Sequence, residues 1–325
     1  MIPLPLAYEI IDAERTKVPG LEIRDDGATV ILNDKQLSKG CQACKTGAWI
    51  CIYIGPNCNL SCDYCPQDDS RHTTKKDRVW VNGGNFSYAD DVKLEDIDWI
   101  IEKNPQIKGI SFSGGEPFMY FDRVVEWAKY LAKYPHIYKW IYTNGTLPTE
   151  AQFKTLAKIG VNEIRFDGAA TEYSDKTIEK IKLARKYFEF ICVETPALPW
   201  LTDKLHSFLS QLKNELDYLN LHTLQINRQL NWPRLLRNHS ELNDALTYKD
   251  SRSGREESLQ SLLETYKTIR HIQENKLDII VNDCGNLNMA NQSAGWFFQR
   301  NNCNGCNEET WENFRERVKK DGGLP

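Results

Sequence analysis

The 325-residue sequence has no apolar run long enough for a membrane-spanning helix, which needs roughly 20 such residues. Its longest apolar run covers only residues 48–54, and its first residues lack the charged and apolar regions of a secretory signal. An excess of charge of one sign is also missing, because 41 basic residues face 45 acidic ones. Such a balance produces no general field for nucleic acid or an anionic membrane. These absences predict a soluble cytoplasmic protein that binds neither.

Internal repeats and low-complexity tracts are absent as well, and the length allows one large core or two modest ones. Cysteine, in contrast, is abundant, with ten residues that gather in clusters. Without a secretory signal, clustered cysteines favour metal binding over disulfide bonds.

The tightest cysteine cluster is Cys58, Cys62 and Cys65, which follow one another with C-x3-C-x2-C spacing. Three thiols on one short loop can each ligate a different iron of a 4Fe-4S cube and leave the fourth iron open. Structural zinc is the alternative, but it closes its shell with four ligands and usually uses paired C-x2-C knuckles. The spacing therefore favours an iron-sulfur site.

A second motif, Ser113-Gly114-Gly115-Glu116-Pro117, ends an apolar run at residues 109–112. Two glycines allow the backbone to approach a ligand closely. The Glu116 carboxylate can accept a charge-assisted hydrogen bond from an ammonium group. Alone, this motif would indicate no more than a turn. Because it follows the cysteine trio at a distance that fits one helix, the two motifs together indicate a binding site.

Together with Tyr64 just before the third cysteine, the two motifs resemble those of the radical S-adenosylmethionine (radical SAM) superfamily. The resemblance implies that the cysteine trio holds a 4Fe-4S cluster and that SAM chelates its open iron. It also implies that the Gly-Gly-Glu-Pro element holds the amino group of SAM and that Tyr64 contacts the adenine. An external donor of the flavodoxin or ferredoxin type would supply the electron that cleaves SAM to a 5′-deoxyadenosyl radical, which abstracts a hydrogen atom from the substrate.

Three motifs within residues 40–200 are Cys41-x2-Cys44, the Cys58–Pro66 cluster loop and the strand end Glu194-Thr195-Pro196. Together they also resemble, more loosely, the pyruvate formate-lyase activase-like branch that includes an archaeal arginine C-methyltransferase. This resemblance implies a peptide or protein substrate, as in post-translational modification or peptide maturation. A small molecule, a nucleoside or tRNA is the alternative substrate class, although the sequence has no basic excess. An iron-sulfur electron carrier or a zinc-stabilised binding module is the non-enzymatic alternative, and neither explains the Gly-Gly-Glu-Pro motif.

Polar residues end three further predicted strands, and we expect them to line the same cavity. Asn144 lies in a Thr-Asn-Gly element similar to one that the family places beside the SAM ribose, although Asn-Gly is also an ordinary turn. Asp167 and Glu194 close the next two strands. A charge on an otherwise apolar strand is rarely buried without a partner.

After the cysteine trio, strand and helix patterns alternate, which is typical of a parallel sheet wrapped by helices. The sequence predicts an α/β fold, a partial or nearly closed radical SAM barrel of six or seven β/α units. A doubly wound open sheet is the alternative, and in either fold the loops at the carboxyl ends of the strands build the site. The predicted strands are residues 49–54, 107–113, 138–143, 162–166, 189–194, 219–226 and 277–283.

We predict three parts: residues 1–47 with a small hairpin and a cysteine knuckle, the barrel at 48–283, and a cysteine-containing C-terminal extension at 284–325. The hairpin, at residues 21–32, would turn at Asp26-Gly27 with type I′ geometry. Residues 66–86 and 228–257 are predicted as long loops, either substrate lids or solvated connectors.

The remaining cysteines suggest a second site. Cys41-x2-Cys44 and Cys303-x2-Cys306 have the pattern of paired knuckles that close a four-thiolate site for zinc, a single iron or an auxiliary iron-sulfur cluster. Another partition groups Cys284 with Cys303 and Cys306. Cys284 ends the last predicted strand, where it can face the cavity as a ligand or a hydrogen-atom donor. Cys51 and Cys192 lie within apolar strands and are predicted as core residues.

Overall fold

The computed structural model describes residues 1–24, 29–32, 36–66, 78–83, 86–89, 92–103, 105–249 and 256–285. Within these ranges, no helix is both long and apolar enough to cross a membrane. The cysteines at 303 and 306 and the predicted C-terminal extension beyond residue 285 lie outside the described residues.

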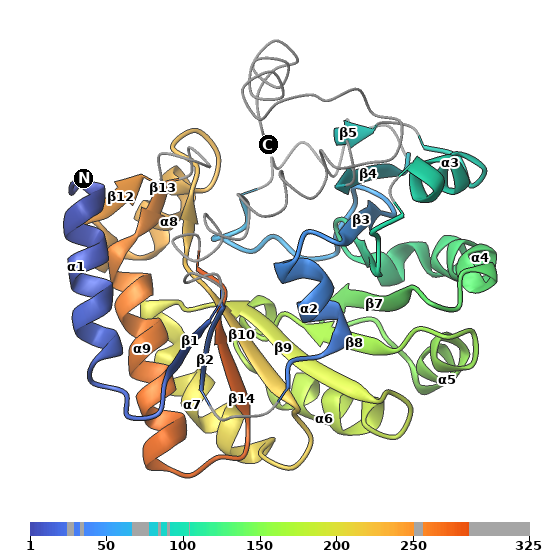
Figure 1. The fold of residues 1–325 in the computed structure, drawn as a ribbon. Coiled ribbons are helices and arrows are strands. Elements are labelled where there is room, and N and C mark those ends of the chain that lie inside the picture. The colour runs from blue at the N-terminus through green and yellow to red at the C-terminus, as the bar shows by residue number, and fades with distance from the viewer. Residues whose placement is uncertain are drawn as a thin grey trace.

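Seven parallel strands form the centre of the large sheet in the described part of the chain (Figure 1). They are β3 (Trp49–Tyr53), β6 (Gly109–Ser113), β7 (Tyr138–Thr143), β8 (Glu163–Phe166), β9 (Phe190–Pro196), β10 (Tyr218–His222) and β14 (Ile280–Asp283). They pair in chain order, so each strand is added beside the previous one. A doubly wound sheet would reverse its order at a switch point, so this alternative is wrong.

Antiparallel strands border both edges of the parallel strands. The predicted hairpin is confirmed as β1 (Glu22–Arg24) and β2 (Thr29–Leu32), and β2 pairs with β14; its turn lies outside the described residues. At the other edge, β4 (Trp80–Gly83) and β5 (Phe86–Ala89) follow β3. Because β3 and β14 pair with different neighbours, the sheet is an open, partial barrel, as predicted.

The outer face of the sheet is apolar and covered by helices. The helices are α3 (Asp96–Lys103), α4 (Phe121–Tyr130), α5 (Glu150–Lys158), α6 (Asp175–Ala184), α7 (Thr202–Gln211) and α9 (Leu259–Glu274). Each buries one stripe of apolar side chains; α4, for example, buries Val124, Trp127 and Ala128 at helical spacing. The predicted capping box is present at the start of α5, where the side chains of Thr149 and Gln152 bond each other's backbone.

Two further helices come before the barrel and were not predicted. The first, α1 (Leu4–Arg15), packs along α9 (Figure 1). The second, α2 (Lys39–Lys45), lies against the inner face of β6 and β7. A side chain at Gly40 would meet the Arg165 guanidinium at 2.9 Å and the Trp140 ring at 3.2 Å, so glycine is needed for this close approach.

The segment predicted as a loop at residues 228–257 is partly folded. It contains α8 (Trp232–Asn238) and β12 (Thr247–Lys249), and a small sheet joins β12 to β13 (Glu256–Ser258) and β11 (Gln225–Ile226). These elements are too short for a periodic pattern to reveal them. Single 3₁₀ turns complete the described structure: η3 (Pro117–Tyr120), η4 (Leu131–Lys133), η5 (Ala169–Thr171), η6 (Pro199–Leu201) and η7 (Ser240–Leu242).

Candidate active site

A cavity of about 420 Å³ opens at the carboxyl ends of the parallel strands. Folds of this class place their active sites at this end, and the volume suits a small-molecule cofactor. All the residues that we predicted for cluster, SAM or catalysis in the first site lie on its wall: Cys58, Cys62, Tyr64, Cys65, Ser113, Gly114, Gly115, Glu116, Asn144, Asp167, Glu194 and Cys284. The structure therefore brings together residues that are spread over more than 220 positions of sequence.

The cysteine trio lies on the loop that leaves β3, and its three thiols are half-buried and free of disulfide bonds. In the described part of the chain, no three His, Cys, Asp or Glu side chains converge as ligands of one metal ion would. Cysteines that bind different irons of a cube do not need to converge on one point. Three thiols that do not converge on one point thus fit an iron-sulfur cube better than a mononuclear zinc ion, which needs its ligands to converge.

The glycines of the second motif make room for the cluster loop. A Cβ atom on Gly114 would lie 2.4 Å from the Gly55 carbonyl oxygen, and one on Gly115 would lie 2.0 Å from the Asn57 oxygen. The backbone N–H of Gly115 and Glu116 donate to these same two oxygens at 3.0 and 2.8 Å. The two glycines thus allow the strand end to bond the loop backbone, while both also line the cavity.

Glu116 is 1% exposed and accepts three hydrogen bonds. They come from the Thr143 hydroxyl (2.9 Å), the Asn144 backbone N–H (2.7 Å) and the Phe118 backbone N–H (3.1 Å). All three donors are uncharged, and burial raises the pKa of Glu116 to about 7. A carboxylate offers about four acceptor positions, so one remains for a further donor such as an ammonium group.

Asn144 and Asp167 fasten the cluster loop to the ends of β7 and β8. The Asn144 amide donates to the Asn59 side-chain oxygen at 2.9 Å, and it lies 3.8 Å from the Cys58 sulfur. The Tyr64 hydroxyl donates to Asp167 at 2.9 Å. Burial raises the pKa of Asp167, which the Tyr64 and Thr195 hydroxyls partly oppose. The adenine contact of Tyr64 stays a prediction, but its hydroxyl has a structural partner.

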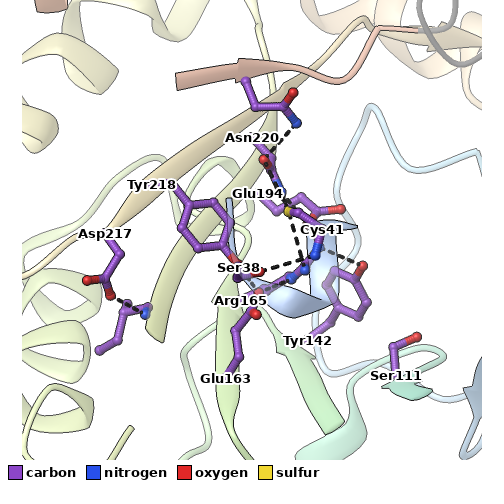
Figure 2. A network of polar contacts seen from close by, with 12 residues as sticks. Ser38, Cys41, Ser111, Tyr142, Glu163, Arg165, Glu194, Asp217, Tyr218 and Asn220 are labelled. Carbon is purple, nitrogen blue, oxygen red and sulfur yellow. Dashed lines mark hydrogen bonds and ion pairs between the residues drawn. The ribbon is translucent and has the colours of Figure 1, made fainter. Parts of the chain in front are cut away.

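A network of polar side chains lies on the inner face of the sheet (Figure 2), and Glu194 joins it to the cavity wall. Glu194 accepts from Arg165 at 2.7 Å, from Asn220 at 3.1 Å and from His222 at 3.0 Å. Burial opposes ionisation, but Arg165 and then His222 hold the pKa of Glu194 well below its ordinary value. Arg165, 2% exposed, also donates to Glu163 at 2.5 Å.

His222 lines the cavity and was missed in the sequence. It ends β10 and alternates with Asn220, the same strand-end position that singled out Asp167 and Glu194. The rule that we used for carboxylates would have found it, had it been applied to every polar side chain.

The other cysteines divide between the network and the cavity. On α2, the Cys41 sulfur lies 3.5 Å from an Arg165 nitrogen and 3.4 Å from the Asn220 amide, and burial raises the pKa of Cys44 to about 12. Cys41 and Cys44 thus lie on a helix that packs against the inner face of the sheet. The four-thiolate site with Cys303 and Cys306 stays a prediction. The Cys284 sulfur accepts from the Asn282 amide at 2.6 Å on the cavity wall.

Residues 52–212 match the model of the Radical SAM superfamily. The chain contains a domain of this superfamily of enzymes. The matched residues of this radical SAM protein run from β3 to the end of α7, and they include the cluster loop, the Gly-Gly-Glu-Pro motif, Asn144, Asp167 and Glu194.

Two relatives come from Methanocaldococcus jannaschii. One, named as a glycyl-radical enzyme activating enzyme, is 26% identical over 61% of this chain and 52% of its own length. The other, a 7-carboxy-7-deazaguanine synthase, is 27% identical over 32% of this chain and 43% of its own. The chain thus spans about half the length of these relatives.

Solved structures with a similar fold include SuiB of Streptococcus suis bound to S-adenosylmethionine. It has a TM-score of 0.47 and 16% identity over 72% of this chain and 49% of that one. The same protein bound to the precursor peptide SuiA has a TM-score of 0.47 and 14% identity over 85% of this chain and 60% of that one.

Proposed function

We propose that this radical SAM protein cleaves SAM reductively at a 4Fe-4S cluster held by Cys58, Cys62 and Cys65, and abstracts a hydrogen atom from a peptide or protein. The observation that carries the proposal is that one cavity is lined both by the three thiols and by residues 113–117. The bound cluster and SAM supply the chemistry, a one-electron cleavage of the sulfonium carbon–sulfur bond that gives the hydrogen-abstracting radical.

The contribution of the chain is to bind and orient these groups. Gly114 and Gly115 fix the cluster loop on the end of β6, so the three thiols keep their places relative to the SAM-binding strand ends. Glu116, with one acceptor position left, is the partner for the ammonium of SAM.

A peptide or protein substrate is supported by the name of the first relative, because an activating enzyme for a glycyl-radical enzyme acts on another protein. A small molecule related to a nucleobase is the second candidate, supported by the deazaguanine synthase, whose match covers a smaller share of this chain. The electron would come from a flavodoxin- or ferredoxin-type donor in either case.

Anaerobic reconstitution with iron and sulfide, followed by incubation with SAM and a strong reductant, tests the proposal. We expect formation of 5′-deoxyadenosine, measured by liquid chromatography, and about four irons per chain that depend on the cluster loop. Cys58→Ala should lose both, whereas Cys51→Ala, which removes a buried thiol outside the loop, should keep both. The proposal fails if wild-type protein forms no 5′-deoxyadenosine, or if Cys58→Ala binds iron and cleaves SAM as wild type does.

A further inference from the structure

One short helix far along the chain makes polar contacts with the end of the cluster loop. The helix is α8, and its contacts with the loop join residues at least 167 positions apart. They fall on three consecutive loop residues, Asp63, Tyr64 and Cys65. Cys65 is itself one of the three cluster ligands that the proposed function requires.

Asn231, the residue before α8, makes the most buried of these contacts. It is 0% exposed, and its amide nitrogen donates to the Tyr64 carbonyl oxygen at 2.8 Å and to the Gln225 carbonyl oxygen at 2.9 Å. Its side-chain oxygen accepts from the Asn227 backbone N–H at 2.8 Å. One amide group thus joins the cluster loop to β11, and its donor hydrogens are both used.

Arg234 and Asn238 continue the same line of contacts. A guanidinium nitrogen of Arg234 donates to the Cys65 carbonyl oxygen at 2.7 Å, a charge-assisted bond to the backbone of a cluster ligand. The Asn238 amide donates to the Asp63 carboxylate at 2.9 Å. His239 adds a nitrogen 3.4 Å from the same carboxylate while its ring stacks on Trp200 at 3.8 Å.

The spacing of these side chains indicates a built contact surface. Residues 231, 234 and 238 are separated by three and four positions, which places them on one face of the helix. Arg237, the neighbouring residue of the same type, is exposed. Helix α8 is itself anchored to the rest of the protein. Trp232 and Leu235 are buried, and the Arg228 guanidinium lies 4.6 Å from the Trp232 ring.

Other residues hold the first half of the cluster loop. The Asn144 amide donates to the Asn59 side-chain oxygen, and the Asn59 amide donates to the Thr146 hydroxyl at 2.8 Å. The end that carries Cys65 is held by the Tyr64 hydroxyl, by a turn bond from the Cys65 N–H to the Cys62 carbonyl oxygen, and by the contacts from α8.

We propose that α8 is a clamp that holds residues 63–65 in their ligand-binding conformation before the cluster is inserted, with Asn231, Arg234 and Asn238 as positioning residues. The clamp gives the third thiol its place relative to the other two. It also fastens the loop to β11, whose Gln225 lines the cavity, so the cluster end and this wall of the cavity share one support. The proposal rests on the proposed function only in naming the cluster as the group that the loop receives.

Hydrogen–deuterium exchange of the anaerobic, metal-free protein tests the clamp without any cluster. Arg234→Ala removes a charge-assisted bond, and we expect peptides covering residues 58–66 to exchange about tenfold faster or more. Arg237→Ala, which removes the same side chain from the exposed face of α8, should leave their exchange unchanged. Unchanged exchange of this loop in both Arg234→Ala and Asn238→Ala overturns the proposal.

A variant that loosens the whole barrel would speed exchange in β10 and α9 as well. In that case Asn238→Ala decides, because Asn238 is exposed and its loss leaves the core intact. Faster exchange confined to the loop in this variant supports the clamp, and unchanged exchange of the loop refutes it. In reconstituted protein, Arg234→Ala should lose iron to a chelator about 10–100-fold faster than Arg237→Ala. If wild-type protein binds no cluster, the proposed function fails while the exchange result still decides the clamp.

Discussion

Glu116 and Glu194 line the same cavity, yet their surroundings shift their pKa values in opposite directions. Glu116 accepts only from uncharged donors, and burial raises its pKa to about 7. Glu194 is also largely enclosed, but Arg165 and His222 beside it hold its pKa below the ordinary range. Burial alone therefore favours the neutral acid, and a cationic partner reverses the effect.

The difference divides the cavity into two regions. At the cluster end, a carboxyl group that can exchange a proton near neutral pH lies beside the predicted SAM site. In the other region, the Glu194 carboxylate, which is ionised at neutral pH, belongs to a network that holds β8, β9 and β10 together through side chains (Figure 2). Paired titratable groups with opposite shifts are common where a site must both bind and react.

The largest expected effect comes from removing the cation that distinguishes the two regions. Arg165→Ala leaves Glu163 and Glu194 enclosed without their guanidinium partner, and we expect it to lower the free energy of unfolding by about 3–5 kcal/mol. The exposed pair of Lys204 and Glu172 is the control, because Lys204→Ala should cost about 1 kcal/mol or less. Denaturant unfolding of metal-free protein measures both, and equal losses would contradict the distinction.

The next effect concerns the pH dependence that Glu116 imposes. Its folded pKa, about 7, lies above the ordinary 4.5, so the folded state binds this proton more tightly than the unfolded state does. The stabilisation is complete below about pH 4.5 and is lost as pH rises through 7, which amounts to about 3 kcal/mol.

Glu116→Gln removes this titration. The free energy of unfolding of wild-type protein, relative to the variant, should therefore fall between pH 5 and pH 8. Parallel pH profiles for the two proteins, obtained from denaturant unfolding at each pH, would show that Glu116 titrates normally.

The smallest effect in the neutral range belongs to Glu194, and its sign is opposite. Because its folded pKa is lowered, Glu194 stabilises the fold above its unfolded pKa of about 4.5, and this contribution is lost as pH falls through the folded pKa. Between pH 5 and pH 8, wild-type protein and Glu194→Gln should differ by a constant amount. Below pH 4.5, the difference in free energy of unfolding between wild type and Glu194→Gln should shrink in acid unfolding experiments. A difference that widens below pH 4.5 would contradict this prediction.

The sequence predicted many of the residues that line the cavity, because each of them lies at or just after the end of an apolar strand. Parallel strands bring their carboxyl ends to one edge, so Glu116, Asn144, Asp167 and Glu194 had to meet once the strands were recognised. Successive side chains of a strand point to opposite faces of the sheet. Arg165 therefore points to the polar inner face, while its neighbours on β8 face the helices.

Other parts of the molecule carried no such pattern. Helices α2 and α8 have seven residues each, and helices this short depend on tertiary contacts. The approach of Gly40 to Arg165 and the contacts of Asn231 with the cluster loop join positions that no local spacing relates. The inner position of Cys41 was hidden for the same reason, since its C-x2-C spacing suits both a knuckle and one face of a helix.

Electron paramagnetic resonance of the reduced, reconstituted protein tests the central claim most directly, because it reports whether SAM reaches the cluster in this cavity. We predict one signal typical of a reduced 4Fe-4S cluster that disappears in Cys58→Ala and changes its g values when SAM is added. A signal that SAM leaves unchanged, or one that persists in Cys58→Ala, would contradict the assignment of the cluster loop and the cavity.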